Sequence, residues 1–514
     1  MFTGFILTDT QRLADAMGEK HSEVLETLFS YVNGSKAYIN WVMVDASDPM
    51  YADMNKEDWH AYASILNDYY FGLGMKDFGN FPLFIIGGED VIPMPTAQNP
   101  LQASGGEFLS SDMLYCFDTQ NGYSELQLVM DKPRFAVGRL PIANEYTLVD
   151  LHNYLEDCLA RTPDGIHVRG AAMTTTESWL RASKEMMRDL PIASLSEEYV
   201  PLNERMIVSP LLDTSYQDMY DGYVHELKKV DFLVCNLHGS DEPGHPQFFG
   251  EDKEGTKKTI ATQPSMLEQT CPLIFNTVAC YGARYTGYEM DDSMLLMAMA
   301  YGTLLYCGAC DTSFGGPEED GVAREGRSEL LMKLYNIYLH QGQPAGMALL
   351  KAKQDYYRTC HTFDSDERAM FTILEFNLFG CPILAMQPEL PEDYRPLLLN
   401  NRIVANQSVT YQPKKSKPVW NSAYQAEDIH AYVQRLVDNN LTLIRQKVEK
   451  EVYQRLGLGK DSLRVVLSIT QNNNEVGYQF VYRWSPQGVY SRMEMCCLVD
   501  TDMQGSIVEI TRTK

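Results

Sequence analysis

Two apolar segments decide the fold: Val230-Asp-Phe-Leu-Val-Cys-Asn-Leu-His-Gly-Ser240 and Cys271-Pro-Leu-Ile-Phe-Asn-Thr-Val-Ala-Cys-Tyr281. Each is a short apolar run that ends at a chemically reactive side chain, His238 in the first and Cys280 in the second. Runs of this length, bounded by glycine, proline and polar residues, predict strands that are buried on both faces of a parallel sheet. Catalytic groups in such sheets lie beyond the carboxyl ends of the strands. We therefore expect His238 and Cys280 to face one cleft.

Strand and helix patterns alternate on both sides of these segments, which predicts an α/β fold with a mainly parallel sheet. Apolar runs predict strands at 5–7, 37–44, 81–86, 135–140, 170–174 and 303–306. Helical spacing predicts helices at 58–70, 145–160, 183–190, 291–301, 330–340 and 344–357. A hinge at 161–165 separates a first α/β subdomain, residues 1–162, from a second one, residues 163–388.

The pattern changes beyond residue 388. Residues 389–421 are rich in proline and polar residues and predict a linker. Residues 422–514 predict a small α+β domain, in which a long helix at about 426–456 precedes a β-meander. The expected strands of this meander are at 464–470, 477–484, 490–499 and 506–511.

Composition and charge exclude several classes of partner. The chain of 514 residues has 69 acidic and 43 basic residues, giving a formal charge of −26. This charge disfavours nucleic acid and anionic membranes and favours basic partners or substrates. No stretch approaches the roughly 18 apolar residues that a membrane span needs. The N-terminus lacks the pattern of a signal peptide, and the 11 cysteines lie mostly inside apolar runs. We expect a cytoplasmic protein, or a secreted one from which a signal has been removed.

The residue types at the two strand ends suit acyl transfer to a thiol. Cys280 would be the nucleophile, since the thiolate is the attacking form of cysteine. His238 would give a proton to the leaving amine, because imidazole titrates nearest to neutral pH. Gly239 allows a close approach of the backbone, so its N–H and that of Cys280 would bind the developing oxyanion.

This arrangement resembles that of caspases, legumains, clostripains, separases and gingipains, in which an apolar block with His-Gly precedes an apolar block with the cysteine. The chain is most similar to the gingipains, over about residues 81–384. The segments that carry the resemblance are Asn236-Leu-His-Gly-Ser240, Leu273-Ile-Phe-Asn-Thr-Val-Ala-Cys280, Ser111-Asp112 with Tyr115, Val137-Gly-Arg-Leu-Pro141 and Asn377-Leu-Phe-Gly-Cys-Pro382.

The resemblance implies a cysteine endopeptidase that acts on protein or peptide substrates. Its fold would be a caspase-haemoglobinase-like three-layer sandwich in two adjacent subdomains, with the catalytic pair in the second. Glu177, after the strand Ala172-Met-Thr-Thr-Thr176, matches the acidic residue that orients the histidine in gingipains. Cleavage after Lys or Arg would need an acid in the substrate pocket, for which Asp311 and Asp291 are candidates. No cofactor is implied, and no motif supports a structural calcium ion.

The chain departs from the family in its closing motif, in the segment Tyr281-Gly-Ala-Arg-Tyr285 after the cysteine, in its N-terminus without a signal peptide and in its C-terminal domain. The closing motif is Gly380-Cys381-Pro382, where the family usually has Gly-Asp-Pro. The C-terminal domain is predicted to be α+β, whereas gingipains carry an immunoglobulin-like tail. The compartment, the activation mechanism and the partner of the C-terminal domain therefore cannot be carried over.

Several other interpretations of the sequence stay open. Cys307-Gly-Ala-Cys310 has the spacing of a redox or zinc motif. His245, and His361 with Asp364, have the side chains of a metal site but lack further ligands nearby, and Glu318-Glu-Asp320 has the charge of a calcium site. A protein of a different class would be a catalytically idle, caspase-like scaffold that uses its C-terminal domain for interaction.

Overall fold

The computed structural model covers both α/β parts of the chain and the C-terminal sheet. It describes residues 2–388 except 74–79, 102–105, 118–129, 131, 143–145, 169, 189–190, 194–198, 202–205, 210–226, 229, 241–247, 254–257, 317, 320–321, 324–325 and 361–365. Beyond residue 388 it describes 447–452, 454, 464–472, 475–484, 495–502 and 505–512. The predicted linker at 389–421 and most of the predicted helix at 426–456 lie outside the described residues.

A ten-stranded sheet forms the centre of the molecule. Its spatial order is β11 (Met206–Ser209), β8 (Ala171–Thr176), β12 (Phe232–Asn236), β16 (Ile274–Thr277), β17 (Leu305–Ala309), β20 (Phe376–Gly380), β6 (Phe135–Leu140), β3 (Phe81–Ile86), β1 (Phe2–Thr8) and β2 (Ile39–Asp45). Neighbouring strands are parallel except β17 and β20, which are antiparallel. Strands β6, β3, β1 and β2 therefore carry their carboxyl ends to the opposite edge from β8, β12 and β16.

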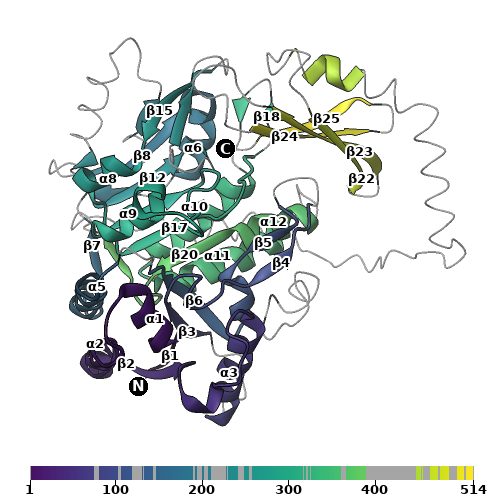
Figure 1. Cartoon of the computed structure of the whole chain (residues 1–514). Helices are drawn as coiled ribbons and strands as arrows, with labels where there is room; N and C mark the ends of the chain where they lie inside the picture. Colours follow the sequence, from purple (N-terminus) through teal and green to yellow (C-terminus); the bar gives the residue numbers. More distant parts are fainter. Residues whose placement is uncertain are drawn as a thin grey trace, which may run out of the picture.

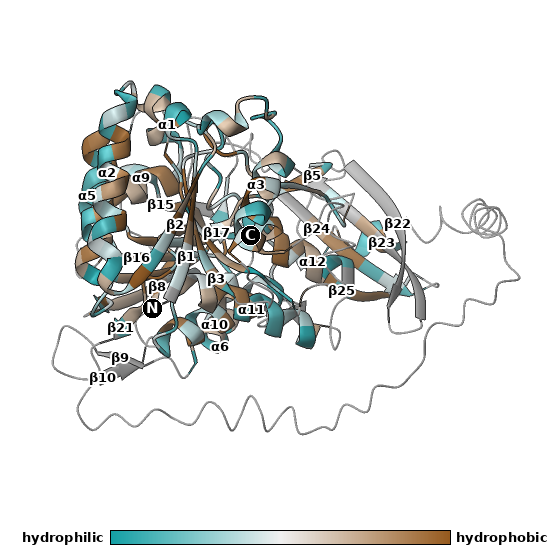
Figure 2. Cartoon of the chain, turned by 90° about the horizontal axis from the view of Figure 1, so that it is seen from below, coloured by the Kyte–Doolittle hydropathy of each residue, from teal (hydrophilic) through white to brown (hydrophobic). Residues whose placement is uncertain are grey.

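Helices cover both faces of this sheet (Figures 1 and 2). One face carries α1 (Thr10–Met17), α2 (His21–Gly34), α5 (Leu148–Arg161), α8 (Pro264–Thr270) and α9 (Met294–Ala300). The other carries α3 (Trp59–Gly72), α6 (Leu180–Met186), α10 (Arg327–His340), α11 (Ala345–Cys360) and α12 (Asp366–Glu375). The result is a three-layer α/β sandwich, as the alternating patterns predict.

The sequence of the central strands explains their position. Every residue of β8, β12, β16, β17, β20 and β6 is buried, because these strands have helices against both faces and carry mostly apolar or small side chains. Figure 2 shows the same contrast, with hydrophobic residues in the sheet and hydrophilic residues on the outer sides of helices such as α2 and α5. One continuous core therefore spans both predicted subdomains.

Smaller sheets lie around this core. They pair β4 (Thr96–Gln98) with β5 (Phe108–Ser110), β7 (Ile166–Val168) with β21 (Met386–Pro388), β9 (Pro191–Ala193) with β10 (Tyr199–Pro201), and β18 (Glu318–Glu319) with β19 (Val322–Ala323). A three-stranded sheet joins β13 (His238–Gly239), β14 (Phe248–Glu251) and β15 (Lys258–Thr262). The C-terminal meander consists of β22 (Arg464–Asn472), β23 (Glu475–Trp484), β24 (Met495–Asp502) and β25 (Ile507–Arg512).

The sequence predictions of individual elements are largely confirmed, although several elements were missed. The strands around 5–7, 81–86 and 135–140 and the four strands of the meander are present within a few residues. The edge strand β11 and the sheet β13–β14–β15 were not predicted, because their strands are short and lie among polar residues.

No helix among the described residues is long and apolar enough to cross a membrane.

A buried ion pair joins the two halves of the sheet. Arg139, at the end of β6, donates from Nε and Nη2 to both carboxylate oxygens of Asp112, at 2.8 and 2.6 Å, and from Nη1 to the carbonyls of Gly87 and Ile92. The backbone N–H of Asp112 donates to Oδ1 of Asn377 in β20, at 2.9 Å. A planar guanidinium suits this bidentate contact, so the pair sets the position of the segment between β3 and β6 against β6 and β20.

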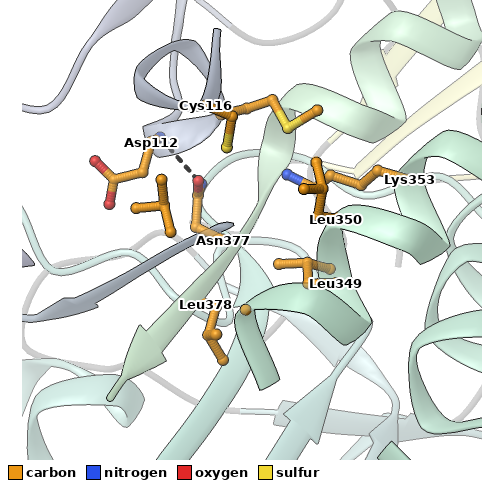
Figure 3. A pocket seen from close by; sticks show the side chains of 10 residues that line it. Asp112, Cys116, Leu349, Leu350, Lys353, Asn377 and Leu378 are labelled. Atoms are coloured by element: carbon orange, nitrogen blue, oxygen red, sulfur yellow. Dashed lines mark hydrogen bonds between the residues drawn. The ribbon is translucent and has the colours of Figure 1, made fainter. Parts of the chain in front are cut away.

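A small cavity with a buried lysine lies next to this ion pair (Figure 3). Lys353 of α11 points into it, and Asp112, Cys116 and Asn377 also line it. The Lys353 ammonium donates to the carbonyl of Phe376 at 2.6 Å, and burial lowers the pKa of Lys353 to about 8. Burying this cation therefore costs free energy in the folded protein, because the ammonium loses contact with water, and the unfolded chain does not incur this cost.

We predict that Lys353 makes stability depend on pH. The folded pKa of about 8 is below the ordinary value of 10.5, so the unfolded chain binds more protons between these values. The free energy of unfolding of the wild type, relative to Lys353→Met, should therefore rise with pH over this window, by at most about 3 kcal/mol. Urea unfolding of both proteins at pH 7 to 10.5 measures this difference. A difference that does not change with pH would contradict the prediction.

Candidate active site

The register of two parallel strands brings His238 and Cys280 together. Strand β12 pairs with β16 so that Cys235 lies opposite Thr277. His238 and Cys280 each follow these partners by three residues, so both lie just beyond the same edge of the sheet. The structure therefore places the two predicted residues on adjacent segments, as the two apolar runs predict.

Gly239 shows how closely these segments approach. A Cβ atom at Gly239 would lie 1.7 Å from the carbonyl oxygen of Cys280 and 3.1 Å from its backbone nitrogen. No side chain can occupy that space, because real Cβ atoms do not approach backbone atoms to under 3 Å. Glycine at 239 is therefore required for the backbone of the histidine segment to touch that of the cysteine.

The carboxylate partner of His238 is Glu251. Nε2 of His238 and Oε2 of Glu251 are 2.8 Å apart, and both side chains are almost completely buried. Glu251 is the last residue of β14, which pairs with β13 so that His238 lies opposite Phe249. The hydroxyl of Thr176, at the end of β8, donates to the carbonyl of Glu251 and accepts from its N–H, which fixes β14 over the sheet edge.

The ring of Trp179 packs against the imidazole of His238. Their ring centroids are 4.4 Å apart and the planes are tilted by 55°. Trp179 is the last residue of the 3-10 helix η4 (Glu177–Trp179), which directly follows β8. With Glu251 at Nε2 and Trp179 against the ring, the orientation of the imidazole is set by two independent contacts.

The thiol of Cys280 lies against the segment that follows β17. The backbone N–H of Ser313 donates to Sγ of Cys280 at 3.1 Å, and Sγ is 3.5 Å from the carbonyl oxygen of Ser313. The N–H donor suits a thiolate, whereas the carbonyl oxygen suits a thiol that donates its proton. The thiol side chain is 3% exposed, so the structure shows the sulfur in a covered state.

A strained turn follows the cysteine. Tyr281 has φ +53°, a conformation that is rare for a residue with a side chain, and its N–H donates to the carbonyl of Asp311 at 2.8 Å. The N–H of Ala283 donates to the carbonyl of Ala309 at 2.8 Å. These contacts turn the chain sharply after β16 and keep Cys280 at the tip of the turn.

The three acids proposed from the sequence lie in different places. Glu177 starts η4, is exposed, and makes no side-chain hydrogen bond or ion pair within the part of the chain that the structure describes, whereas Glu251 contacts His238. Asp311 is half-buried and contacts the turn after Cys280 through its carbonyl. Asp291 is exposed in the 3-10 helix η6 (Met290–Asp292), beside α8 and α9.

Sequence reasoning missed Glu251, Trp179 and Ser313. The segment Phe248-Phe-Gly-Glu251 has an aromatic pair typical of a short strand, but the charged residues after it resemble a surface loop. The contact with His238 comes from an antiparallel pairing that no motif announces. Trp179 and Ser313 reach the site through the same kind of long-range packing.

The redox and metal sites that the sequence left open receive little support from the described residues. Burial raises the pKa of both Cys307 and Cys310 to about 12, which disfavours the thiolates that redox chemistry or zinc would need. No group of three or more metal-binding side chains occurs among the described residues. His245, His361, Asp364 and Asp320 lie outside them, and for Glu318 and Glu319 only the backbone is described.

Comparisons with known proteins give little further information. No family model matches the chain, and no curated protein matches it. Among solved structures, one described as "Structure of Protease" is similar over 100% of this chain and 97% of its own, with a TM-score of 0.49 and 10% sequence identity. A likeness of this degree carries no argument about fold or activity.

The close contact between Gly239 and Cys280 leads to a prediction about stability. In Gly239→Ala the new methyl group must displace the backbone of Cys280, so the free energy of unfolding should fall by about 1–3 kcal/mol. Gly72→Ala is the matched control, because nothing lies within 4 Å of a Cβ at the end of α3 and the change should be neutral or slightly stabilising. Urea unfolding measures both, and equal effects would contradict the close approach.

Proposed function

We propose that the protein is a cysteine peptidase in which Cys280 is the nucleophile and His238 the proton donor. The observation that carries this proposal is the buried pair of His238 and Glu251, 2.8 Å apart, on a segment whose backbone touches that of Cys280. A nucleophile, a base and a carboxylate that orients the base are the groups that acyl transfer requires. Glu251 takes the orienting role that the resemblance assigns to Glu177.

The first half of the reaction forms an acyl-enzyme. The thiolate of Cys280 attacks the carbonyl carbon of the scissile peptide, so that a C–S bond forms and the carbonyl electron pair moves to oxygen. The N–H groups of Gly239 and Cys280 would bind this oxyanion. When the intermediate collapses, the C–N bond breaks and the imidazolium of His238 gives its proton to the leaving amine.

The second half hydrolyses the thioester. Neutral His238 takes a proton from water, the oxygen attacks the thioester carbonyl, and the C–S bond breaks to release the carboxylic acid and the thiolate. Glu251 accepts a hydrogen bond at Nε2 of His238, so the proton that the ring exchanges with substrate would be carried at Nδ1. The buried carboxylate also stabilises the imidazolium that forms after deacylation.

The thiolate itself has a donor in this structure. The N–H of Ser313 lies 3.1 Å from Sγ of Cys280 and favours the charged form of the nucleophile. A thiolate next to an imidazolium is the resting pair on which cysteine peptidases depend. We therefore propose the N–H of Ser313 and the imidazolium of His238 as the groups that stabilise the thiolate of Cys280.

The substrate class belongs to the same proposal. We propose a gingipain-like endopeptidase that prefers Lys or Arg before the cleaved bond, since the chain carries a formal charge of −26 and Asp311 adjoins the turn after Cys280.

The second candidate function is an idle caspase-like scaffold, and the low exposure of the Cys280 thiol favours it. Activity measurements separate the two.

Hydrolysis should depend on Cys280 and favour basic substrates. In a fluorogenic peptide library that varies the residue before the cleaved bond, we expect turnover with Lys or Arg and a loss of more than about 10³-fold in Cys280→Ala. A peptide electrophile with a terminal Arg should label the wild type at Cys280. Equal labelling of Cys280→Ala, or no hydrolysis by the folded wild type, would favour the scaffold. Turnover of only uncharged substrates would refute the basic preference.

The two glutamates can be compared directly. Glu251→Gln removes a charged hydrogen bond to His238 that is worth about 1.5–3 kcal/mol, so kcat/KM should fall by about 10- to 150-fold. Glu177→Gln should have a much smaller effect, because the Glu177 side chain is exposed and does not contact His238. Steady-state kinetics on one basic substrate measures both. A larger loss in Glu177→Gln would restore the assignment made from the sequence.

A further inference from the structure

The segment that contacts the thiol of Cys280 is held by the start of helix α10. Ser313 donates its N–H to Sγ of Cys280, and its hydroxyl donates to the hydroxyl of Ser328 at 2.7 Å. The N–H of Gly316 donates to the carboxylate of Glu329 at 2.9 Å. Ser328 and Glu329 are both fully buried. The position of the thiol therefore depends on how residues 313–316, here named the thiol loop, sit on α10.

Arg327, the first residue of α10, also contacts the thiol loop. Its Nη1 donates to the carbonyl of Gly315 at 3.0 Å. The residue has φ +42°, which is unfavourable for any residue with a Cβ, and it places a cation at a helix N-terminus, where the helix dipole repels positive charge. The side chain is 1% exposed. A buried cation in a strained conformation persists only where its surroundings compensate it.

The compensation comes from the C-terminal sheet. Arg327 donates to the carboxylate of Glu509 and to the hydroxyl of Thr511, both in β25. Burial by itself would raise the pKa of the Glu509 carboxyl, but Arg327 and Arg368 hold it below its ordinary value. Arg368 of α12 also pairs with Asp500 in β24. Figure 1 shows the C-terminal sheet beside β18, on the side of the molecule that carries α12.

We infer that Arg327 is a positioning residue through which the C-terminal sheet holds the thiol loop, and with it the thiol of Cys280, in place for reaction. The inference rests on the proposed function, since it assigns regulation to the same site. The path consists of contacts already described: Glu509 and Thr511 contact Arg327, Arg327 contacts Gly315, and Ser313 donates to the sulfur.

The inference gives the C-terminal sheet a role other than substrate or partner binding. While the sheet is docked, the N–H of Ser313 stabilises the thiolate. If the carboxylate of Glu509 is lost, the buried Arg327 loses a charged hydrogen bond, and its readjustment shifts the carbonyl of Gly315 and the loop around it. The sulfur then loses a donor, and its reactivity falls although Cys280, His238 and Glu251 are unchanged.

The test measures the reactivity of Cys280 in the full-length chain. Alkylation of Cys280 by iodoacetamide is followed by peptide mass spectrometry from pH 6 to 10, and the midpoint of the rate against pH reports thiolate formation. We test a double variant of β25, Glu509→Gln/Thr511→Val, and the single variant Arg327→Met. In both we expect the midpoint to rise by about one pH unit, because the thiolate loses the N–H of Ser313 as a donor. Arg327→Lys keeps the charge and should restore part of the shift.

Controls separate positioning from loss of folding. Val508→Thr changes the neighbouring residue of β25, which is 70% exposed, and should keep the wild-type midpoint. Near-ultraviolet circular dichroism identifies folded variants, and the β25 double variant carries the test if Arg327→Met does not fold. A folded variant with the wild-type midpoint would overturn the inference. A wild type that hydrolyses no peptide would instead overturn the proposed function, while the midpoints would still report on the sheet.

Discussion

The contact between the backbones of Gly239 and Cys280 is the constraint on which the candidate site depends. Parallel pairing of β12 with β16 brings both segments to one sheet edge, and the absence of a side chain at Gly239 lets them touch. His238 and Cys280 become neighbours through this contact. Glu251, Trp179 and Ser313 then surround them from three other elements. Geometry of this kind is set by strand register, which changes only in whole residues.

Buried charges in this protein lie where separate parts of the chain meet. Arg139 and Asp112 join the first half of the sheet to β20, Arg327 and Glu509 join α10 to the C-terminal sheet, and His238 and Glu251 join β13 to β14. Such pairs add little net stability, because desolvation offsets their attraction. Breaking one leaves an uncompensated charge, so each pair enforces one arrangement of its two parts.

The sequence predicted the sheet better than the site. The strands at 230–236 and 273–277 are apolar and short, so their burial and their reactive ends follow from local pattern. The resemblance to gingipains gives the orienting role to Glu177, yet Glu251 contacts His238 from a strand that lies among charged residues. No pattern in the sequence predicts the role of Arg327, because its partners Glu509 and Thr511 lie more than 180 residues away.

The sequence by itself determined the α/β class, the C-terminal meander and the strand ends that carry His238 and Cys280, because each depends on residues that are close together in the chain. Only the tertiary structure decided which carboxylate contacts the imidazole and which N–H contacts the sulfur. These depend on pairings between distant segments, whose energies come from burial and geometry that local pattern does not record.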